Sequence, residues 1–259
     1  MRHKQLSFLE ANRIINQSLT KDLPKKNLRL LSSCQLSQLN IYIKALYANS
    51  GYNLDIEELN FGTLRQYLID NLLHFNDKET ILILMPWDFI ESLNWRTGIP
   101  LEIENIEVYQ NEISAFYNLC NELKIDNLKY IYLDFEFPNF LPKYNENKII
   151  KRQLEDVVEK LSCKVLNNDF FCLSNYTSNG CPFKNKEIGK VAFLIFEHLF
   201  NSINSKKLVV VDLDNTLWDG ILGEIGPLAI DASPNEKGFL FFIFQSFLKN
   251  IKNKGILLA

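Results

Sequence analysis

The sequence has few histidines and no cysteine pattern, and both shortages exclude classes of function. Only three His occur among the 259 residues, so few positions can supply the imidazole base on which Ser-His and Cys-His hydrolases depend. The five Cys are odd in number and scattered, without a C-x-x-C pair, so the sequence indicates neither a zinc site nor a disulfide framework. Reduced thiols are the default in the cytoplasm, where we expect this protein to reside.

The sequence also has no excess of positive charge and no long hydrophobic run. Lys and Arg number 28 against 31 Asp and Glu, and the formal net charge is -3. This balance argues against a nucleic-acid partner, because it forces no basic face. The N-terminus lacks the pattern of a signal peptide, and the longest apolar stretches are too short to span a membrane. We therefore expect a globular protein with no membrane segment.

Apolar strands and amphipathic helices alternate along most of the chain. This alternation predicts a parallel, doubly wound α/β sheet in residues 25–204, after an N-terminal helix and linker in residues 1–24. Residues 205–259 then begin a second domain. The predicted strands are Leu28–Leu31, Tyr52–Leu54, Thr80–Met85, Tyr130–Leu133 and Val165–Leu166, and the predicted helices are residues 5–17, Leu36–Asn49, Leu64–His74, Ile103–Leu123, Ile149–Leu161 and Lys186–Ile203.

The most informative segment lies near the end of the chain, where an apolar β-branched run stops at two carboxylates. Residues 208–211 read Leu-Val-Val-Val, and Asp212, Asp214 and Thr216 follow at alternate positions. In a parallel sheet, ligands bind at the carboxyl end of such a strand. Side chains alternate along an extended strand, so Asp212 and Asp214 can share one face. One carboxylate could attack phosphorus while the other moves protons, and together they could hold Mg²⁺.

The string from Asp212 to Glu224, DLDNTLWDGILGE, resembles the haloacid-dehalogenase (HAD) phosphotransferase superfamily, and within it the FkbH-like proteins of subfamily IIIC. The resemblance implies that Asp212 is a nucleophile that forms an aspartyl-phosphate, and that Asp214 protonates the leaving group and then activates water. It also implies a Mg²⁺ site at Asp212 and Asp214, a phosphate-binding loop shaped by Thr216, and a flap, Gly220–Gly226, that covers the site and excludes water.

The sequence differs from the FkbH-like pattern in the flap region and in the motifs expected after it. Asp219 stands where close relatives usually carry Gly, and Ile225 stands where they carry Asp. The superfamily also needs a Ser or Thr on the next strand, a Lys and late acids, so we expect a C-terminally truncated, incomplete Rossmann-like HAD domain. Without that Lys, two carboxylates repel a phosphate dianion, and turnover should be low. The alternative is a complete small lobe packed on the first domain.

In FkbH-like proteins, the region before the HAD domain resembles an SGNH-hydrolase fold, which is flavodoxin-like. Cys34 stands where that fold carries its nucleophile, and Ser178 and Cys181 stand where its catalytic Asp and His would be. The catalytic pair is therefore missing. This comparison predicts that the first domain is a non-hydrolytic docking or binding platform.

The remaining polar residues of the first domain fit that interpretation. His3 is terminal, His74 ends a predicted helix and His198 lies in a largely apolar helix, so the sequence places none of them as a base. Polar side chains that follow predicted strands are expected to gather at the carboxyl edge of the sheet. These are Ser33, Cys34, Asp88 and Asp134.

Three functions remain open at the level of sequence. The first is the N-terminal portion of an FkbH-like HAD phosphatase and acyl (glyceryl) transferase. The resemblance implies Mg²⁺ as its cofactor, a phosphorylated small molecule as its substrate and an acyl carrier protein as its partner. The second is a truncated, non-catalytic protein whose SGNH-like domain binds a carrier protein or another partner. The third is a Cys-based hydrolase centred on Cys34.

Overall fold

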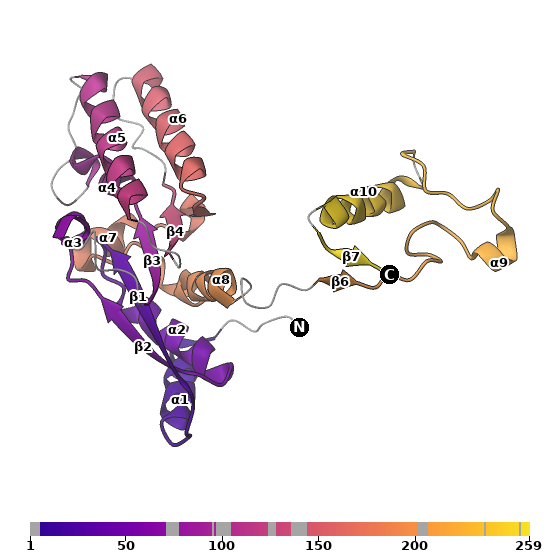
Figure 1. The fold of residues 1–259 in the computed structure, drawn as a ribbon, viewed down its shortest axis with the longest axis horizontal. Helices are drawn as coiled ribbons and strands as arrows, with labels where there is room; N and C mark the ends of the chain where they lie inside the picture. The colour runs from indigo at the N-terminus through magenta and orange to yellow at the C-terminus, as the bar shows by residue number, and fades with distance from the viewer. Residues whose placement is uncertain are drawn as a thin grey trace. The chain divides into compact units, whose positions relative to one another are not determined.

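The structure, a computed structural model, divides into two compact units, Met1–His198 (unit 1) and Leu199–Ala259 (unit 2), each drawn in Figure 1. It describes residues 6–70, 78–94, 96, 105–123, 128–135, 144–200, 207–235, 237–253 and 255–259, without the side chains of residues 144–147. The predicted domain boundary between residues 204 and 205 lies outside the described residues.

Unit 1 is built on one parallel β-sheet. Its strands are β1 (Lys25–Ser32), β2 (Asn53–Glu58), β3 (Glu79–Leu84), β4 (Leu128–Leu133) and β5 (Lys164–Leu166). They are ordered β2-β1-β3-β4-β5, and every neighbouring pair is parallel, which confirms the predicted doubly wound α/β sheet. The strand order reverses between β1 and β3. In such sheets, ligands bind beside this point, outside the carboxyl ends of the strands.

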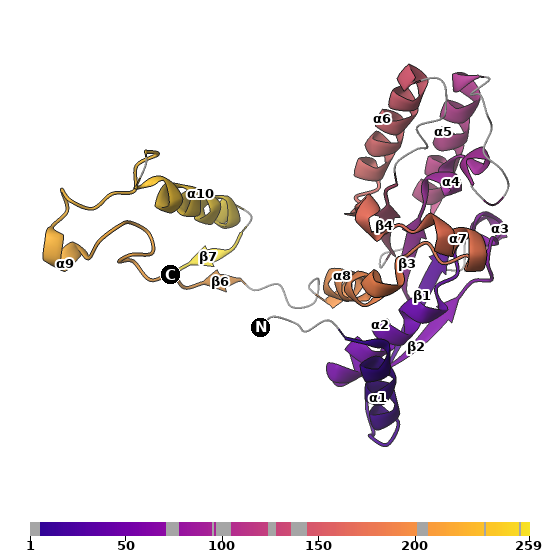
Figure 2. The same cartoon turned by 180° about the vertical axis from the view of Figure 1, so that it is seen from behind.

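Helices cover both faces of this sheet (Figures 1 and 2). The longer ones are α1 (Phe8–Ser18), α2 (Ser37–Asn49), α3 (Leu64–Asp70), α5 (Ile106–Glu122), α6 (Tyr144–Lys160) and α8 (Ile188–Phe200). In one layer, the Phe8 ring of α1 lies 6.3 Å from Tyr42 of α2, and Tyr47 of α2 lies 5.3 Å from Phe196 of α8. In the other layer, α3 and α6 both contact α5. The N-terminal helix therefore packs within unit 1.

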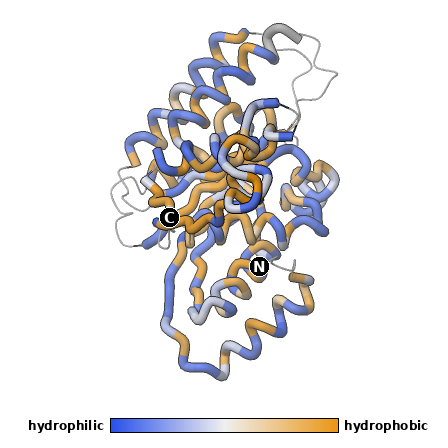
Figure 3. Tube along the Cα trace, turned by 90° about the vertical axis from the view of Figure 1, so that its right-hand side faces the viewer, coloured by the Kyte–Doolittle hydropathy of each residue, from blue (hydrophilic) through white to orange (hydrophobic). Residues whose placement is uncertain are grey.

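The core of unit 1 lies between the sheet and its helices. Residues Ile81–Leu84 of β3 are all fully buried, as expected for a central strand that is covered on both faces. In Figure 3 the long helices alternate between hydrophobic and hydrophilic residues, as expected for helices with one face toward a core. This packing holds the carboxyl ends of β1 and β3 in place.

The sequence prediction differs from the structure at the shortest elements. The four-residue helix α4 (Pro86–Phe89) follows β3 directly, and α7 (Leu173–Asn179) lies where no helix was predicted. Helices of one or two turns carry too few residues for a helical period to be visible. Parts of the predicted helices Leu64–His74, Ile103–Leu123 and Lys186–Ile203 lie outside the described residues.

Unit 2 contains two parallel strands and the helix that connects them. Its elements are β6 (Leu208–Val209), α9 (Leu222–Ile225), α10 (Phe239–Asn253) and β7 (Leu257–Leu258). The strands β6 and β7 pair in parallel. Helix α10 buries Leu248 and leaves large apolar side chains exposed, namely Phe239, Leu240, Phe242, Ile243 and Phe247. Across the described residues of both units, no helix combines the length and apolar character that crossing a membrane requires.

Candidate active site

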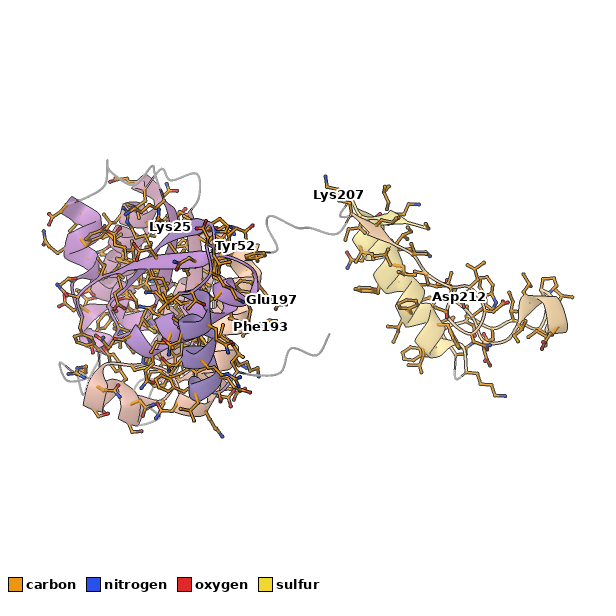
Figure 4. All side chains as sticks on the ribbon, turned by 90° about the horizontal axis from the view of Figure 1, so that it is seen from below. Lys25, Tyr52, Phe193, Glu197, Lys207 and Asp212 are labelled. Atoms are coloured by element: carbon orange, nitrogen blue, oxygen red, sulfur yellow. The ribbon has the colours of Figure 1, made fainter. Side chains whose placement is uncertain are left out.

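Asp212 and Asp214 follow the first strand of unit 2. The N–H of Val211 donates a hydrogen bond to the carbonyl of Ala259 at 2.8 Å, so the β6–β7 ladder continues to the residue just before Asp212. In Figure 4, Lys207 lies at the start of this strand and Asp212 lies past its other end. The pair therefore lies at the carboxyl end of β6, the edge at which parallel strands present ligand-binding residues.

The two carboxylates have different surroundings. Asp212 is exposed, and its Oδ1 accepts a hydrogen bond from the neighbouring Leu213 N–H at 2.9 Å. Asp214 is half-buried, and its Oδ1 accepts from Trp218 Nε1 at 3.0 Å and from Leu222 N–H at 3.1 Å. Asp214 is thus held by the loop that follows it, whereas Asp212 faces solvent.

A tight turn joins the carboxylate pair to the next segment. Asn215 adopts a φ of 54°, a left-handed conformation that Asn tolerates better than most residues. Its Oδ1 accepts from Gly220 N–H at 3.0 Å, and Thr216 N–H donates to the Leu213 carbonyl at 3.2 Å. Gln245 of α10 donates to the carbonyl of Leu217 at 2.6 Å. The helix therefore fixes the turn that carries the predicted phosphate-binding residues.

The segment after this turn closes into a loop, residues 219–231, that contains the predicted flap. Asp219 N–H donates to the Asp231 carbonyl at 3.0 Å, which joins the two ends. Hydrogen bonds from Ser233 lower the pKa of the Asp231 carboxyl. Gly220 has a φ of 100°, and a Cβ there would collide with Cδ1 of Ile225. The loop therefore requires Gly at its first bend.

The charge around the pair favours a cation. Among the described residues, none forms an ion pair with Asp212 or Asp214, and no group of three or more His, Cys, Asp or Glu is arranged to hold a metal ion. Mg²⁺ typically binds through one or two carboxylates and completes its octahedral shell with water and phosphate oxygens. The donor set at Asp212 and Asp214 fits such an ion.

Unit 1 carries a separate small cleft at the carboxyl ends of β1 and β3. Its volume is about 130 Å³, and Ser33, Arg65, Trp87 and Asp88 are among its lining residues. The indole Nε1 of Trp87 donates to Ser33 Oγ at 3.2 Å, and Arg65 Nη2 donates to the carbonyl of Asp88 at 3.1 Å. The structure thus brings Ser33 and Asp88 together at the predicted edge of the sheet.

Asp88 is a buried acid in this cleft. Its Oδ2 accepts a hydrogen bond from Met85 N–H at 2.7 Å. Burial raises the pKa of Asp88 to about 7, against the opposing effects of hydrogen bonds from Ser33 and Met85 and of the charge on Arg65. A carboxyl group that titrates near neutral pH can exchange protons with a ligand.

Cys34 is placed unlike a catalytic nucleophile. Its side chain is 3% exposed, and burial, with a contribution from the charge of Asp88, raises the pKa of its thiol well above the usual value. The hydroxyl of Ser33 lines the cleft, and the Cys34 Sγ lies 4.0 Å from it. Because the thiolate is the reactive form of Cys, this environment disfavours a Cys-based hydrolase.

Within the described residues, no histidine lies where it could act as a base for Ser33 or Cys34. The carbonyl of His198 accepts from Lys129 Nζ at 3.0 Å, near the amino end of β4 and therefore at the edge of the sheet opposite the cleft. His3 and His74 lie outside the described residues. No described imidazole is thus placed to activate Ser33 or Cys34.

The segment that we predicted to align with the second catalytic block of SGNH hydrolases lies against the turn after β1. The N–H of Gln35 donates to the carbonyl of Gly180 at 2.9 Å, which places Ser178 and Cys181 close to this turn in the chain. Asp134 lies elsewhere, because it lines a different cavity of about 380 Å³ beside α6. Of the four polar residues predicted to gather at this edge, Asp134 is therefore apart from the cleft.

Two tryptophans contribute to these sites in ways that the sequence analysis missed. Trp218 donates to Asp214, and Trp87 donates to Ser33 while its ring stacks on Tyr176 at 4.3 Å. Each Trp lies within four residues of a candidate acid, and this proximity could have suggested a supporting role. The direction in which each Trp side chain points, however, depends on the backbone turn around it.

Among solved structures, the chain is similar to the N-terminal part of the protein BF1531 from Bacteroides fragilis, which contains a phosphatase domain and is complexed with Mg. The two share 19% identity with a TM-score of 0.68, over 98% of this chain and 73% of that one. The likeness shows that the two chains share a fold.

A weaker match is the proposed arylesterase from Agrobacterium tumefaciens str. C58, at 8% identity and a TM-score of 0.39, over 68% of this chain and 99% of that one. No protein-family model and no curated sequence matches the chain.

Proposed function

We propose that the chain is a HAD-type, Mg²⁺-dependent phosphatase or phosphotransferase in which Asp212 attacks phosphorus. The observation that carries this proposal is the contrast between an exposed Asp212 at the end of β6 and an Asp214 that the following loop holds in place. The fold that the chain shares with the phosphatase-containing part of BF1531 supports it, as does the complex of that protein with Mg.

The two carboxylates divide the chemistry between them. A carboxylate oxygen of Asp212 attacks the phosphorus of a phosphorylated small molecule, and the bond from phosphorus to the leaving oxygen breaks. Asp214 donates the proton that the leaving oxygen takes up. Water then attacks the phosphorus of the aspartyl-phosphate, Asp214 removes its proton, and the Asp212 carboxylate is restored.

The hydrogen bonds at Asp214 prepare it for this role. Trp218 and Leu222 both donate to Oδ1, so Oδ2 remains available to carry the transferable proton. Thr216 and Gly220, which lie at the two ends of the turn, would border the phosphate. When bound to the Asp212 side chain and the Asp214 carbonyl, Mg²⁺ would neutralise charge on the phosphate and the carboxylates.

Hydrolysis of p-nitrophenyl phosphate tests this proposal. Activity should require Mg²⁺, should be lost in Asp212→Asn and should be strongly reduced in Asp214→Asn. Asp219→Asn is the matched control, because it removes an exposed carboxylate from the same loop and should leave activity in place. Mg²⁺-dependent activity that persists in Asp212→Asn would contradict the proposed nucleophile.

A finer proposal rests on the resemblance of residues 212–224 to the FkbH-like proteins. The substrate would be a phosphorylated three-carbon acyl donor, and the glyceryl unit would be loaded onto an acyl carrier protein. Intact-mass measurement of a carrier protein incubated with the chain and the donor should show the added glyceryl group. An unchanged mass, despite active phosphatase, would limit the function to phosphate removal.

The alternative function is a binding module in unit 1 without catalysis. The buried Cys34 thiol and the absence of a described imidazole near Ser33 favour binding over hydrolysis in this cleft. In this case a carrier protein should bind the Asp212→Asn chain as tightly as the native chain, and Trp87→Ala should weaken binding. A carrier protein that binds neither chain would contradict the alternative.

A further inference from the structure

A third cavity in unit 1 has a distinctly basic lining. It measures about 490 Å³, within the range of small-molecule sites. Four lysines line it, against one Asp and one Glu, although the chain as a whole is acidic. The lysines are Lys164, Lys184, Lys186 and Lys190.

The four lysines come from separate parts of the chain. Lys164 lies on the edge strand β5, Lys184 and Lys186 lie in the segment before α8, and Lys190 lies in its first turns. The N–H of Lys184 donates to the carbonyl of Phe170 at 3.0 Å. This hydrogen bond therefore holds the segment before α8 against the chain at Phe170.

The remaining lining offers an apolar wall and polar groups. Leu166 and Phe170 are buried beneath the cavity, and Lys190 Nζ lies 5.2 Å from the centre of the Phe170 ring. The Asp169 carboxylate accepts from Asn167 Nδ2 at 2.9 Å, so part of its hydrogen-bonding capacity is used within the protein. A ligand with both an anionic and an apolar part matches this lining.

Electrostatics selects the sign of the ligand. Four lysines against one Asp and one Glu give the lining a net positive charge, which attracts an anion. The cavity also lies at the amino end of the 13-residue helix α8, where the helix dipole favours negative charge. Both the lysines and the helix dipole favour binding of an anion, and the lysines favour one with more than one negative charge.

We propose that this cavity binds a small organic anion that carries a phosphate group, with the phosphate among the lysines and the apolar part against Phe170. The site is independent of the phosphotransfer proposed at Asp212.

Isothermal titration calorimetry of the full chain with phenylphosphonate tests this proposal. The carbon–phosphorus bond of this probe resists hydrolysis, and EDTA in the buffer removes metal-dependent binding elsewhere. Saturable binding is expected, and it should weaken as salt is added. Lys184→Gln/Lys190→Gln should raise Kd by about tenfold or more, because it removes two of the four positive charges that line the cavity.

Three variants serve as controls. Lys164→Gln/Lys186→Gln should weaken binding similarly, which guards against a folding defect in the first pair. Lys21→Gln/Lys249→Gln removes the same charge from exposed positions outside the cavity and should leave Kd unchanged. Asp212→Asn should also bind as the native chain does.

Several results would overturn the proposal. They are the absence of saturable binding, equal weakening by the Lys21/Lys249 control, or loss of binding in Asp212→Asn. Binding of poly-glutamate without binding of phenylphosphonate would also overturn it, and would indicate an acidic protein surface as the occupant instead.

Discussion

The indole Nε1 of Trp218 donates a hydrogen bond to Oδ1 of Asp214 at 3.0 Å, four residues back along the chain. This contact closes the turn that follows the carboxylate pair and orients the residue to which we assign proton transfer. The parallel ladder holds the backbone up to Asp212, and the loop that follows it holds Asp214. A small part of unit 2 therefore combines a rigid strand end with a hydrogen-bonded loop.

Removing the indole donor tests this orientation. Trp218→Phe keeps an aromatic ring but loses the N–H, and it should lower kcat by about tenfold or more with little change in KM. Steady-state kinetics with p-nitrophenyl phosphate measure the effect. Trp87→Phe is the matched control, because it removes an indole donor from unit 1 and should leave these constants unchanged. An equal loss in both variants would contradict the role given to Trp218.

The bend at Gly220 should not accept a side chain. Gly220→Ala places a β-carbon on a backbone with a φ of 100°, at an expected cost of about 1–3 kcal/mol in the free energy of unfolding. Gly223 lies in α9 with open space around it, so Gly223→Ala should be neutral or slightly stabilising. Urea unfolding followed by tryptophan fluorescence compares the two. Similar destabilisation by both would indicate that the loop is not held as described.

Asp88 should make the stability of unit 1 depend on pH. Its pKa rises from 3.8 to about 7 on folding, so between these values the folded chain holds a proton that the unfolded chain releases. The free energy of unfolding should therefore decrease as pH rises through this window, by a contribution on the order of 4 kcal/mol. That contribution is fully present below the unfolded pKa and is lost above the folded pKa.

Asp88→Asn isolates this contribution. Asn keeps an oxygen that can accept from Met85 N–H but cannot ionise. The stability of the variant relative to the native chain should therefore increase from pH 4 to pH 8, as measured by unfolding at each pH. A difference that stays constant with pH would show that Asp88 titrates normally in the fold.

Unit 1 should not hydrolyse simple esters. The Cys34 thiol is buried with a raised pKa, and the described structure places no imidazole near Ser33. Turnover of p-nitrophenyl acetate should match the background rate and should not change in Cys34→Ala or Ser33→Ala. Turnover that either substitution abolishes would reinstate the hydrolase that the sequence left open.

Much of the fold could be predicted from the sequence because the long elements carry strong patterns. The apolar run at β3 and the helical period of α5 define an alternation that leads to one sheet. The short helix α4 escaped prediction because Pro86–Phe89 is less than two turns long. Its position nevertheless matters, since it aims Trp87 and Asp88 into the cleft.

The candidate sites were predicted less completely than the fold. The place of Asp212 and Asp214 just after β6 could be predicted from the apolar run before them. The hydrogen bonds that Trp218 and Leu222 donate to Asp214 depend on a turn around Asn215. In unit 1, the sequence suggested Cys34 as the nucleophile position, but the structure lines the cleft with Ser33. Which of two adjacent side chains faces a cleft depends on the backbone of the turn, and composition does not reveal it.

Chemical trapping at Asp212 tests the central claim most directly. Borohydride reduces an aspartyl-phosphate to homoserine and releases phosphate, and peptide mass spectrometry locates the converted residue. With p-nitrophenyl phosphate and Mg²⁺, we predict homoserine at position 212 in the native chain, and none at that position when EDTA replaces Mg²⁺. Conversion of Asp214 instead, or no conversion at Asp212 in the presence of donor and Mg²⁺, would contradict the assignment of Asp212 as the phosphoryl acceptor.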